Sequence, residues 1–428
     1  MCALSQKPLA SLSLARALIF LLLAISSAAQ AATTTVEAGT PLQQAIDRAS
    51  IGDTLLLLGG IHQGPITIDK TLKLTGKDKA IIQGNGEGRV VTISAADVSV
   101  SNLGIQNSGD SLATEDAGIY VTKAGERALI HNNVLTGNLI GVYLKGPKNA
   151  KVLGNTIIGS ENPHVNDRGN GVQLWNTPGS IVADNNISLG RDGIFVNASE
   201  NNIFRDNVMH NLRFAVHYMY THNSTVSGNL SRGNHVAYAL MYSNNLEVHD
   251  NVSDGDRDRG LFLNFTNDSN FSNNRVSGAE KCFFIYNANS NDISNNSFSS
   301  CDIGIHFTAG SEGNAVSGNA FIDNKTQVKY VGTRYVEWSS EGRGNFWSDN
   351  LAFDLNDDGI ADQPYKPNDM VDQLIWRHPM AKLLLSSPAM QVLRWAQSEF
   401  PSLHPGGVRD SSPLMTHHDR QNNGSTAQ

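Results

Sequence analysis

The sequence is poor in cysteine and, after its first residues, has no long apolar run. Of 428 residues only three are cysteine, and one of these, Cys2, lies in the N-terminal segment. After residue 31 no apolar stretch reaches the length of about 20 residues that crosses a membrane as a helix. Basic residues are also outnumbered, with 32 Lys and Arg against 40 Asp and Glu. These shortages argue against a membrane-spanning protein and against nucleic acid as a partner.

Residues 1–31 have the pattern of a secretory signal. Lys7 and Arg16 give a positive start, Ala17 to Ile25 forms an apolar core too short for a membrane span, and Ala29-Gln30-Ala31 resembles a cleavage site. Removing the segment takes away two basic residues and no acid, so the formal charge changes from −8 to −10. We therefore expect an exported, acidic mature protein.

Helical stretches are missing between the apolar segments of the central region, which excludes a fold with crossover helices. Instead, short segments alternate apolar and polar residues with a period of two, which indicates strands. A column of asparagines repeats every 22 or 23 residues, with one spacing of 30. Its members are Asn155, Asn185, Asn207, Asn229, Asn251, Asn274, Asn296 and Asn319. A period of this length predicts a solenoid, and short strands without helices predict a parallel β-helix.

The asparagine column also predicts how the coils are held together. Equivalent residues of successive coils stack about 4.8 Å apart, so side-chain amides can hydrogen-bond along the stack. Asparagine also tolerates the left-handed backbone that tight corners require. A structural role for the column is therefore favoured over a functional one.

The chain divides into four regions by composition. After the signal segment, the solenoid is predicted over residues 32–332, with a short amphipathic helix at 40–49 that covers its open end. Residues 333–400 form a non-repeating region that is rich in aromatic residues and Asp and contains one or two helices. Residues 401–428 are polar, and we expect a disordered tail.

Cys282 and Cys301 remain after export, where a disulfide is allowed. One coil beyond Cys282 lies Gly304, three residues after Cys301. In an extended backbone this offset is too long for a bridge. The spacing therefore favours two buried free thiols over a disulfide.

A face with His and Met is the first candidate site. Successive side chains of a strand point to opposite faces, so His217 and Met219 point outward if their sequence neighbours point inward. Met241 then stacks one coil beyond Met219. Exposed thioethers beside imidazoles are typical of soft-metal ligands and favour copper, especially Cu(I). From the spacing alone, a surface that packs against a partner protein ranks before a copper site, and a bend that turns Met219 into the core ranks third. The first two interpretations are compatible, because a metal-transfer site must also dock a donor or acceptor.

A second candidate is an Asp-rich loop that resembles the first half of a calcium-binding loop. Oxygen-bearing side chains and a glycine occupy the required positions, but position 12 is Tyr365 instead of Glu. The candidate calcium ligands are Asp354, Asn356, Asp358 and Asp362. An ordinary turn explains the same pattern.

An enzymatic function must also be considered, because many parallel β-helices act on polysaccharides. The run from Asp254 to Arg259, with Asp192 and His210 nearby, supplies carboxylates for acid–base chemistry. The alternating charges of this run also fit a self-neutralising exposed loop. We find no paired-Asp set typical of glycosidases and no Asp-Pro-His typical of epimerases.

Several segments together resemble the NosD family of periplasmic proteins. They are the Asn-cornered coils, His217-Tyr218-Met219-Tyr220 with Tyr238-Ala239-Leu240-Met241-Tyr242, and Gly344-Asn345-Phe346-Trp347-Ser348-Asp349 running into the Asp354–Tyr365 loop. The coils alone are shared with carbohydrate-acting proteins, so the Met/Tyr segments and the Asn-Phe-Trp segment carry the specificity. The resemblance extends over nearly the whole chain after the signal segment.

The resemblance implies a right-handed parallel β-helix in the periplasm of a denitrifying bacterium, without enzymatic activity or catalytic residues of its own. It implies a role in maturing the copper centres of nitrous-oxide reductase. The expected partners are the membrane subunit and ATPase of an ABC transporter, a copper chaperone and the apo-reductase. The candidate ligands for transiently bound Cu(I) are His210, His217, Met219, His222, His235 and Met241. The candidate partner-binding residues are Tyr220, Tyr242, Trp338, Trp347, Trp376 and Trp395, of which those after residue 333 would contact the membrane subunit.

Overall fold

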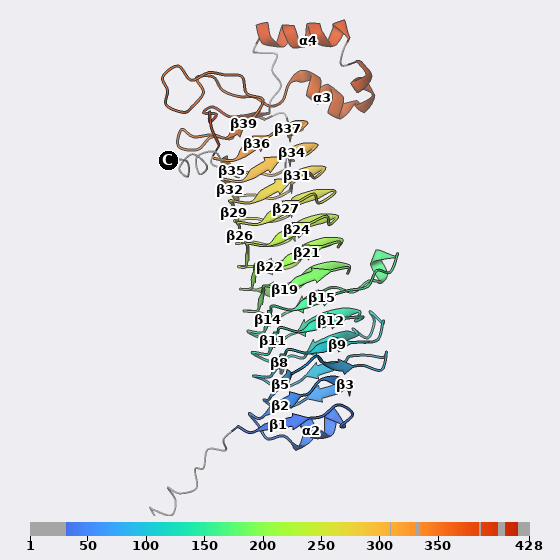
Figure 1. Ribbon diagram of the computed structural model, residues 1–428. Helices are drawn as coiled ribbons and strands as arrows, with labels where there is room; N and C mark the ends of the chain where they lie inside the picture. Colours follow the sequence, from blue (N-terminus) through green and yellow to red (C-terminus); the bar gives the residue numbers. More distant parts are fainter. Residues whose placement is uncertain are drawn as a thin grey trace, which may run out of the picture.

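The computed structural model describes residues 31–417 apart from 309, 331, 333, 385–386 and 401–406. Within this part of the chain, the strands form three long parallel sheets, A, B and C, wound coil upon coil (Figure 1). The prediction of an all-β parallel β-helix with coils of about 22 residues is therefore confirmed. The predicted signal segment, apart from Ala31, lies outside the described residues.

Each sheet collects one strand from every coil. Sheet A contains, in order, β1 (Thr33–Val36), β2 (Thr54–Leu57), β5 (Lys73–Gly76), β8 (Ser99–Ser101), β11 (Leu129–His131), β14 (Lys151–Leu153), β17 (Ile181–Ala183), β20 (Ile203–Arg205), β23 (Thr225–Ser227), β26 (Glu247–His249), β29 (Asn270–Ser272), β32 (Asp292–Ser294) and β35 (Ala315–Ser317). Sheet B contains β3 (Gly60–Gln63), β6 (Ala80–Gln83), β9 (Gly104–Gln106), β12 (Val134–Thr136), β15 (Thr156–Ile158), β18 (Asn186–Ser188), β21 (Val208–His210), β24 (Leu230–Arg232), β27 (Val252–Asp254), β30 (Arg275–Ser277), β33 (Ser297–Ser299), β36 (Ala320–Ile322) and β39 (Phe346–Trp347). Sheet C contains β4 (Ile66–Ile68), β7 (Val91–Ile93), β10 (Ala117–Val121), β13 (Ile140–Lys145), β16 (Val172–Trp175), β19 (Asp192–Glu200), β22 (Phe214–His222), β25 (Val236–Met241), β28 (Arg259–Asn264), β31 (Lys281–Tyr286), β34 (Ile303–Phe307) and β37 (Thr326–Tyr330).

Alternation along each strand decides which side chains enter the core. In β22, Val216 and Tyr218 are buried in the continuous core, whereas His217 and Met219 lie on the outer face of sheet C. The inward side chains of successive coils stack on one another, so each coil buries its apolar face only with its neighbours.

The predicted asparagine ladder is present at the corner between sheets A and B. Each side-chain amide donates to the amide oxygen of the next coil, for example Asn207 to Asn229 at 2.9 Å and Asn229 to Asn251 at 3.0 Å. The left-handed residue of the corner is not the ladder asparagine but the residue before it, such as Asp206 with φ 56°. The ladder therefore satisfies buried polar groups, while its neighbour makes the turn.

The N-terminal end of the core is covered by a helix, as predicted. Helix α2 (Leu42–Arg48) lies across the first coils and buries Leu42 and Ile46 in the core. The helix shields strand edges and apolar side chains that an open solenoid end would expose to water.

The C-terminal end is closed by stacked aromatic rings. Trp347 lies face to face with Phe321 at a centroid distance of 4.3 Å, and Trp338 and Tyr365 pack on the same stack. Trp338 and Trp347 are 0% and 2% exposed, which corrects the prediction that their side chains face a partner. The open end of the core needs large apolar surfaces, and these two side chains supply them.

The segment around Asp410 folds back onto this stack. Strand β40 (Val408–Arg409) pairs with β38 (Val336–Glu337), and Asp410 accepts hydrogen bonds from the Asn345 backbone N (2.7 Å) and Trp347 Nε1 (2.8 Å). Asn345 is the last asparagine of the ladder, so the Asp410 carboxylate takes the place of an amide from a further coil. The prediction of disorder is therefore wrong for residues 407–417, while the rest of the predicted tail lies outside the described residues.

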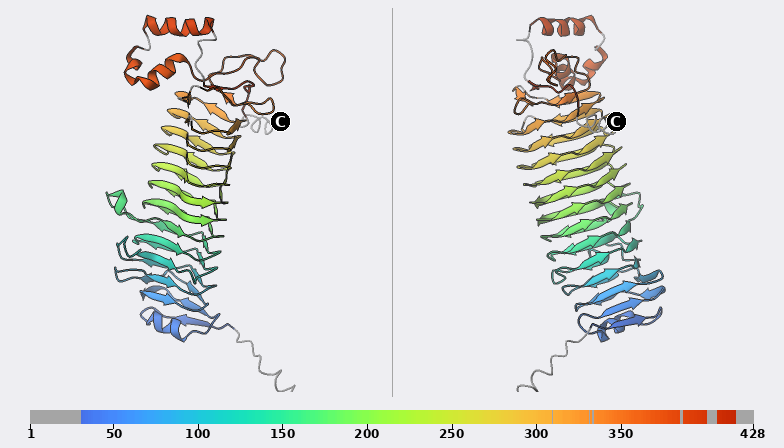
Figure 2. Two further views of the ribbon diagram at one scale, coloured as in Figure 1. Left: turned by 180° about the vertical axis from the view of Figure 1, so that it is seen from behind. Right: turned by 60° about the vertical axis from the view of Figure 1, so that its left-hand side comes forward.

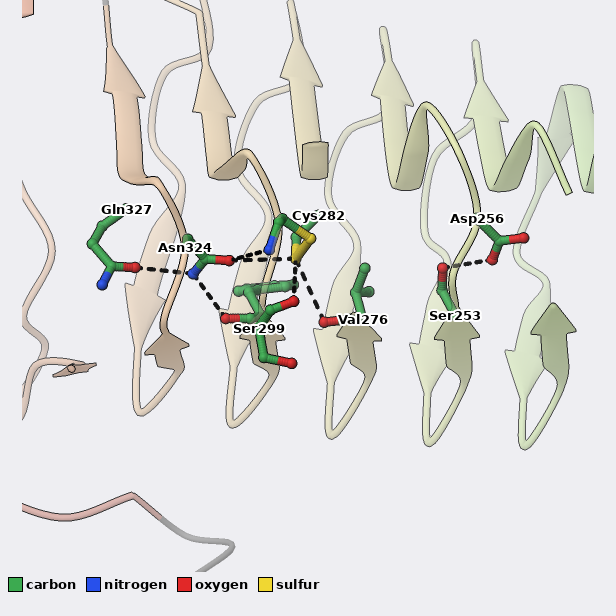
Figure 3. The surroundings of a disulfide bond; sticks show 9 residues. Ser253, Asp256, Val276, Cys282, Ser299, Asn324 and Gln327 are labelled. Atoms are coloured by element: carbon green, nitrogen blue, oxygen red, sulfur yellow. Dashed lines mark hydrogen bonds between the residues drawn. A yellow bond between two sulfur atoms is a disulfide. The ribbon is translucent and has the colours of Figure 1, made fainter. Parts of the chain in front are cut away.

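Cys282 and Cys301 form a disulfide, contrary to the expectation of free thiols. Cys282 pairs in register with Gly304, as the spacing predicted, but the backbone turns at positive φ at Ser300. This turn brings the Cys301 Cα to 5.7 Å from that of Cys282, although an extended chain would place it farther away. Asn324 lies beside the bridge and accepts a hydrogen bond from the Cys301 backbone N at 3.0 Å (Figure 3).

The remaining helices stand beyond the last coils (Figures 1 and 2). They are α3 (Met370–Arg377), the 3-10 helix η2 (Pro379–Leu384) and α4 (Pro388–Glu399), and a further 3-10 helix, η1 (Val165–Asp167), lies in a loop of the solenoid. Val371, Ile375 and Met390 form a small core between α3 and α4 that is separate from the solenoid core.

Candidate functional site

The candidate copper site lies on the outer face of sheet C, on β22 and β25. Met219 pairs in register with Met241, and His217 pairs with Ala239. All three candidate side chains, His217, Met219 and Met241, are half-buried. The structure thus brings these three together on one face and excludes the interpretation that Met219 enters the core.

His217 is held by a buried carboxylate. Its Nδ1 lies 2.9 Å from Oδ2 of Asp192, whose side chain is 1% exposed. Arg213 donates two further hydrogen bonds to the same carboxylate, from Nε at 2.8 Å and from Nη2 at 2.6 Å. Phe195 and Phe214 pack against the imidazole ring, with centroid distances of 5.0 and 4.8 Å.

The charge state of Asp192 fixes the tautomer of His217. Burial alone raises the pKa of Asp192, but the hydrogen bonds from His217 and Arg213 outweigh it and hold the pKa below its ordinary value. The carboxylate is therefore ionised and accepts the Nδ1–H of His217. Nε2 is the nitrogen that remains for a ligand, which is how carboxylates orient metal-binding histidines in proteins.

An exposed row of aromatic rings borders the two methionines. Tyr220 lies in β22, and Tyr242 and Phe265 directly follow β25 and β28. These three rings stack at centroid distances of 5.1 and 5.2 Å, and Tyr286 meets Phe265 edge-on. The first three have positive φ values between 50° and 56°, which is uncommon for bulky residues. Of these, the sequence analysis selected Tyr220 and Tyr242 and missed Phe265 and Tyr286.

The other candidate histidines lie apart from this group, two of them outside sheet C and one at the end of β22. His210 lies on β21 of sheet B, where its Nδ1 is 3.2 Å from the Asn211 amide. His222 lies at the far end of β22 and accepts a hydrogen bond from the Asn244 backbone N at 3.1 Å. His235 precedes β25 at the opposite corner, 3.8 Å from Asp258. The structure therefore separates the six candidate ligands into a group of three and three isolated histidines.

The donor set decides which metal this face fits. In the part of the chain that the structure describes, no three His, Cys, Asp or Glu side chains cluster in a way that could hold a metal ion. A metal at His217 would therefore depend on the thioethers of Met219 and Met241. Imidazole with thioethers suits Cu(I) and is poor for hard cations, so the residues fit copper.

The Asp-rich loop is wound around its own carboxylates. Asp354 accepts hydrogen bonds from the backbone N of Asp358 and Gly359, and Asp362 accepts one from Leu355 N at 2.8 Å. Backbone N–H groups thus satisfy the side chains of Asp354 and Asp362, and backbone N–H groups also satisfy those of Asn356 and Asp358, as in an ordinary Asx turn. Calcium binding stays a prediction.

The C-terminal aromatic candidates differ in exposure. Trp395 on α4 is 61% exposed, and Val392 beside it is similarly open, whereas Trp376 on α3 is half-buried. Leu383 of η2 is exposed as well, as are Leu351 and Leu355 in the loop after β39. A surface of this kind marks a contact site for another protein or a membrane.

The acidic run considered for catalysis does not assemble a site. Asp256 is fully buried and accepts hydrogen bonds from Ser253 Oγ and the Asn234 backbone N, so it belongs to the corner structure. Asp254 is exposed and pairs with Arg232. Asp258 lies 3.8 Å from His235, and Asp192 is hydrogen-bonded to His217 rather than to His210. The sequence does contain a signal for the position of Asp192. The residue lies directly before Gly193 of the repeat, one coil before Phe214, with which it pairs in register.

No helix among the described residues is long and apolar enough to cross a membrane. A family model described as "Periplasmic copper-binding protein (NosD)" matches residues 160–352, the region that contains His217, Met219 and Met241. A relative from Stutzerimonas stutzeri, "Probable ABC transporter binding protein NosD", is 40% identical over 96% of both chains. The chain belongs to the NosD family.

A second NosD relative, of the same description and from Pseudomonas aeruginosa, is 42% identical over 84% of this chain and 87% of its own. Among solved structures, the chain is similar to an exopolygalacturonase from Thermotoga maritima, with a TM-score of 0.54, 11% identity and coverage of 69% and 91% of the two chains. It is also similar to a mannuronan C-5 epimerase module from Azotobacter vinelandii, with a TM-score of 0.51, 13% identity and coverage of 67% and 90%. At these identities the structures support the β-helix fold of this NosD family member and nothing about its activity.

Proposed function

We propose that the protein is a periplasmic copper-handling adaptor of an ABC transporter complex that helps to assemble the copper centres of nitrous-oxide reductase. The observation that carries the proposal is His217, oriented by buried Asp192 beside the thioethers of Met219 and Met241. The description of the family as periplasmic and copper-binding, and the naming of two relatives as ABC transporter binding proteins, support the same role.

Copper in this role is a cargo rather than a resident cofactor. His217 would contribute Nε2, and Met219 and Met241 would contribute thioether sulfurs to Cu(I). These side chains are half-buried at the surface, not enclosed in the core, so an ion bound there is accessible to a second protein. Transient binding, with uptake from a copper chaperone and release toward the apo-reductase, follows from that placement.

The aromatic row beside the methionines is the proposed docking surface for the protein that gives or takes the ion. Tyr220, Tyr242, Phe265 and Tyr286 are exposed beside the strands that carry the two thioethers. Aromatic side chains are enriched in the centres of protein interfaces because they bury much surface at low entropic cost. A partner seated on this row would contact the copper face.

The apolar surface of η2 and α4 is the proposed contact with the transporter's membrane subunit. Its exposed side chains include Leu383, Val392 and Trp395, and it lies at the end of the solenoid opposite to α2 (Figure 2). The partner ATPase would act on this protein only through the membrane subunit. The copper face and the transporter contact are thus separate along the long axis.

An anaerobic Cu(I) competition titration tests the copper role. We expect one Cu(I) site in the wild-type protein and loss of that site in the variant His217→Ala/Met219→Leu/Met241→Leu. The matched control is His210→Ala, which removes a histidine of the same candidate set from sheet B. Equal binding by wild type and the triple variant, with the fold intact by circular dichroism, would contradict a copper site on this face.

A polysaccharide-modifying activity is the second candidate, and one contact favours it. A histidine whose Nδ1–H is bound by a buried carboxylate is also the arrangement of a general base, and Asp192 and His217 have it. Incubation with alginate and polygalacturonate, followed by chromatography of the products, separates the two functions. Turnover that is lost in His217→Ala would replace the adaptor function by an enzymatic one.

A further inference from the structure

The spacing of 30 residues in the asparagine column marks an insertion at the corner between sheets B and C. The extra residues lie in the loop between β15 and β16, which contains η1 and projects from the side of the solenoid (Figure 1, green, at the right). The loop forms a wall of two separate hollows. Ser160, Asn162 and Asp167 line the one toward the N-terminus, and Glu161, Val165 and Arg168 line the one toward the C-terminus.

The C-terminal hollow is a groove of about 800 Å³. It runs along the corners of successive coils from Leu189 through Asn211 and Gly233 to Arg257. Three coil steps of about 4.8 Å make it roughly 15 Å long, which is the reach of four or five extended residues. The groove is therefore elongated along the solenoid axis and open to solvent on one side.

The groove is cationic in a protein that is acidic as a whole. Three arginines, Arg168, Arg213 and Arg257, line it, against a single acid, Glu161. Arg213 is neutralised by Asp192. Arg168 donates from Nε to the carbonyl oxygen of Asn162 in its own loop, but within the described residues neither Arg168 nor Arg257 forms an ion pair with a carboxylate. The chain has a formal charge of −8, so the overall charge of the protein does not explain why arginines without an acidic partner line one hollow.

The floor of the groove limits the kind of anion. Its aliphatic lining residues are Val165, Leu189 and Leu212, and the lining contains no Phe, Tyr or Trp. Sugar rings of an acidic polysaccharide would find no ring to stack on, whereas leucine or valine side chains would fit such a floor. Guanidinium groups at both ends suit separate carboxylates, because arginine clusters recognise acidic motifs through paired N–H donors.

We propose that this groove binds an extended acidic segment of a partner protein, with carboxylates at Arg168 and Arg257 and aliphatic side chains on the floor between them. The site is distinct from the copper face, and the proposal stands whether or not the protein handles copper. The insertion would position the segment by contributing one of the two guanidinium groups and part of the floor.

Fluorescence anisotropy with a labelled decapeptide of alternating Glu and Leu tests the proposal on the mature protein. We expect saturable binding that weakens with added salt, and a loss of at least about tenfold in affinity in Arg168→Glu/Arg257→Glu. The control Lys73→Glu/Lys151→Glu changes the net charge equally on exposed residues of sheet A and should bind as wild type.

Three results would overturn the proposal. They are no binding by wild type up to 1 mM peptide, equal losses in the groove and control variants, or binding of tetragalacturonate in place of the peptide. A Cu(I) titration of the groove variant, carried out in parallel, keeps this test separate from the copper role, because Arg168 and Arg257 do not contact His217 or Asp192.

Discussion

Nδ1 of His217 donates a hydrogen bond of 2.9 Å to Oδ2 of Asp192, a carboxylate that is 1% exposed and also bound by Arg213. This contact joins one coil to the next and leaves Nε2 of the imidazole as the only free ring nitrogen. It makes His217 different from the other candidate histidines, His210, His222 and His235, for which the structure gives no buried carboxylate at Nδ1. The orientation of the imidazole is thus fixed by the protein itself.

The first prediction concerns this orienting carboxylate. Asp192→Asn keeps the size of the side chain but removes the charge that holds the Nδ1–H tautomer. We expect Cu(I) affinity to fall by about 10- to 100-fold, as for other partners of metal-binding histidines. The control Asp206→Asn changes an exposed carboxylate on a neighbouring corner. A variant that binds Cu(I) as tightly as wild type would show that Asp192 has only a structural role.

The second prediction concerns pH and the same residue. The pKa of Asp192 in the folded state lies below its ordinary value of 3.8. The ionised carboxylate therefore stabilises the fold at pH values above 3.8. This contribution is lost as the pH falls through the lower pKa of the folded state. We expect the stability advantage of wild type over Asp192→Asn to shrink below about pH 4. Urea unfolding of both proteins at a series of pH values measures this difference. A constant difference down to the lowest pH would contradict the shifted pKa.

The third prediction concerns Asp410, where the sign is opposite. Burial raises the pKa of Asp410 above its ordinary value, even though Asn345 and Trp347 donate hydrogen bonds to it. The folded state therefore binds the proton more tightly than the unfolded state, and wild type loses stability relative to Asp410→Asn as the pH rises through the folded-state pKa.

Two substitutions at Asp410 separate charge from hydrogen bonding. Asp410→Asn keeps an acceptor for Asn345 and Trp347, so we expect it to be tolerated at neutral pH. Asp410→Ala leaves both donors buried without a partner, at a cost of about 1–3 kcal/mol each. Thermal unfolding at pH 5 and pH 8 measures both effects. Equal stability of the Asn and Ala variants would show that the carboxylate does not close the ladder.

The repeat and its ladder could be predicted from the sequence because they depend on local rules. A period of 22 residues, strands with period-two alternation and stacked asparagines each restrict the backbone independently, and all agree. The outward placement of His217, Met219 and Met241 follows from the same alternation. Spacing alone is therefore enough to predict the fold and which residues face outward.

The errors occur where the chain leaves the repeat. Trp338 and Trp347 were expected at a partner surface, and residues 407–417 in a disordered tail, because no periodicity indicates which segments close the solenoid. Gly344 shows the kind of signal that was missed, because a Cβ there would lie 1.7 Å from Asp410 Oδ1. The Gly-Asn-Phe-Trp segment is thus required by packing against a residue more than sixty positions away, which single-sequence spacing does not reveal.

The contacts around His217 were found only in part, for a related reason. The alternation places His217 on the outer face, but its partner Asp192 lies one coil and three residues earlier, at the first residue of β19, where the preceding corner sets the direction of the side chain. The sequence analysis therefore assigned Asp192 to a hypothetical catalytic group with His210. Corner geometry, which also decided the disulfide, is the information that the repeat pattern lacks.

The last prediction concerns that disulfide. Cys282 and Cys301 lie on successive coils of one continuous core, so their bond closes a loop of 19 residues and ties two coils together. We expect thiol labelling of the unfolded mature protein only after reduction, and a loss of about 2–4 kcal/mol in the free energy of unfolding for Cys282→Ala/Cys301→Ala. Wild type measured in urea with and without a reductant is the matched comparison, because it changes the bond without changing the buried volume. Labelling of both cysteines before reduction would contradict the bond and restore the interpretation of two buried thiols. A bond without any effect on stability would mean that the neighbouring coils, which the Asn274–Asn296–Asn319 ladder joins at the corner between sheets A and B, already hold the two residues in place.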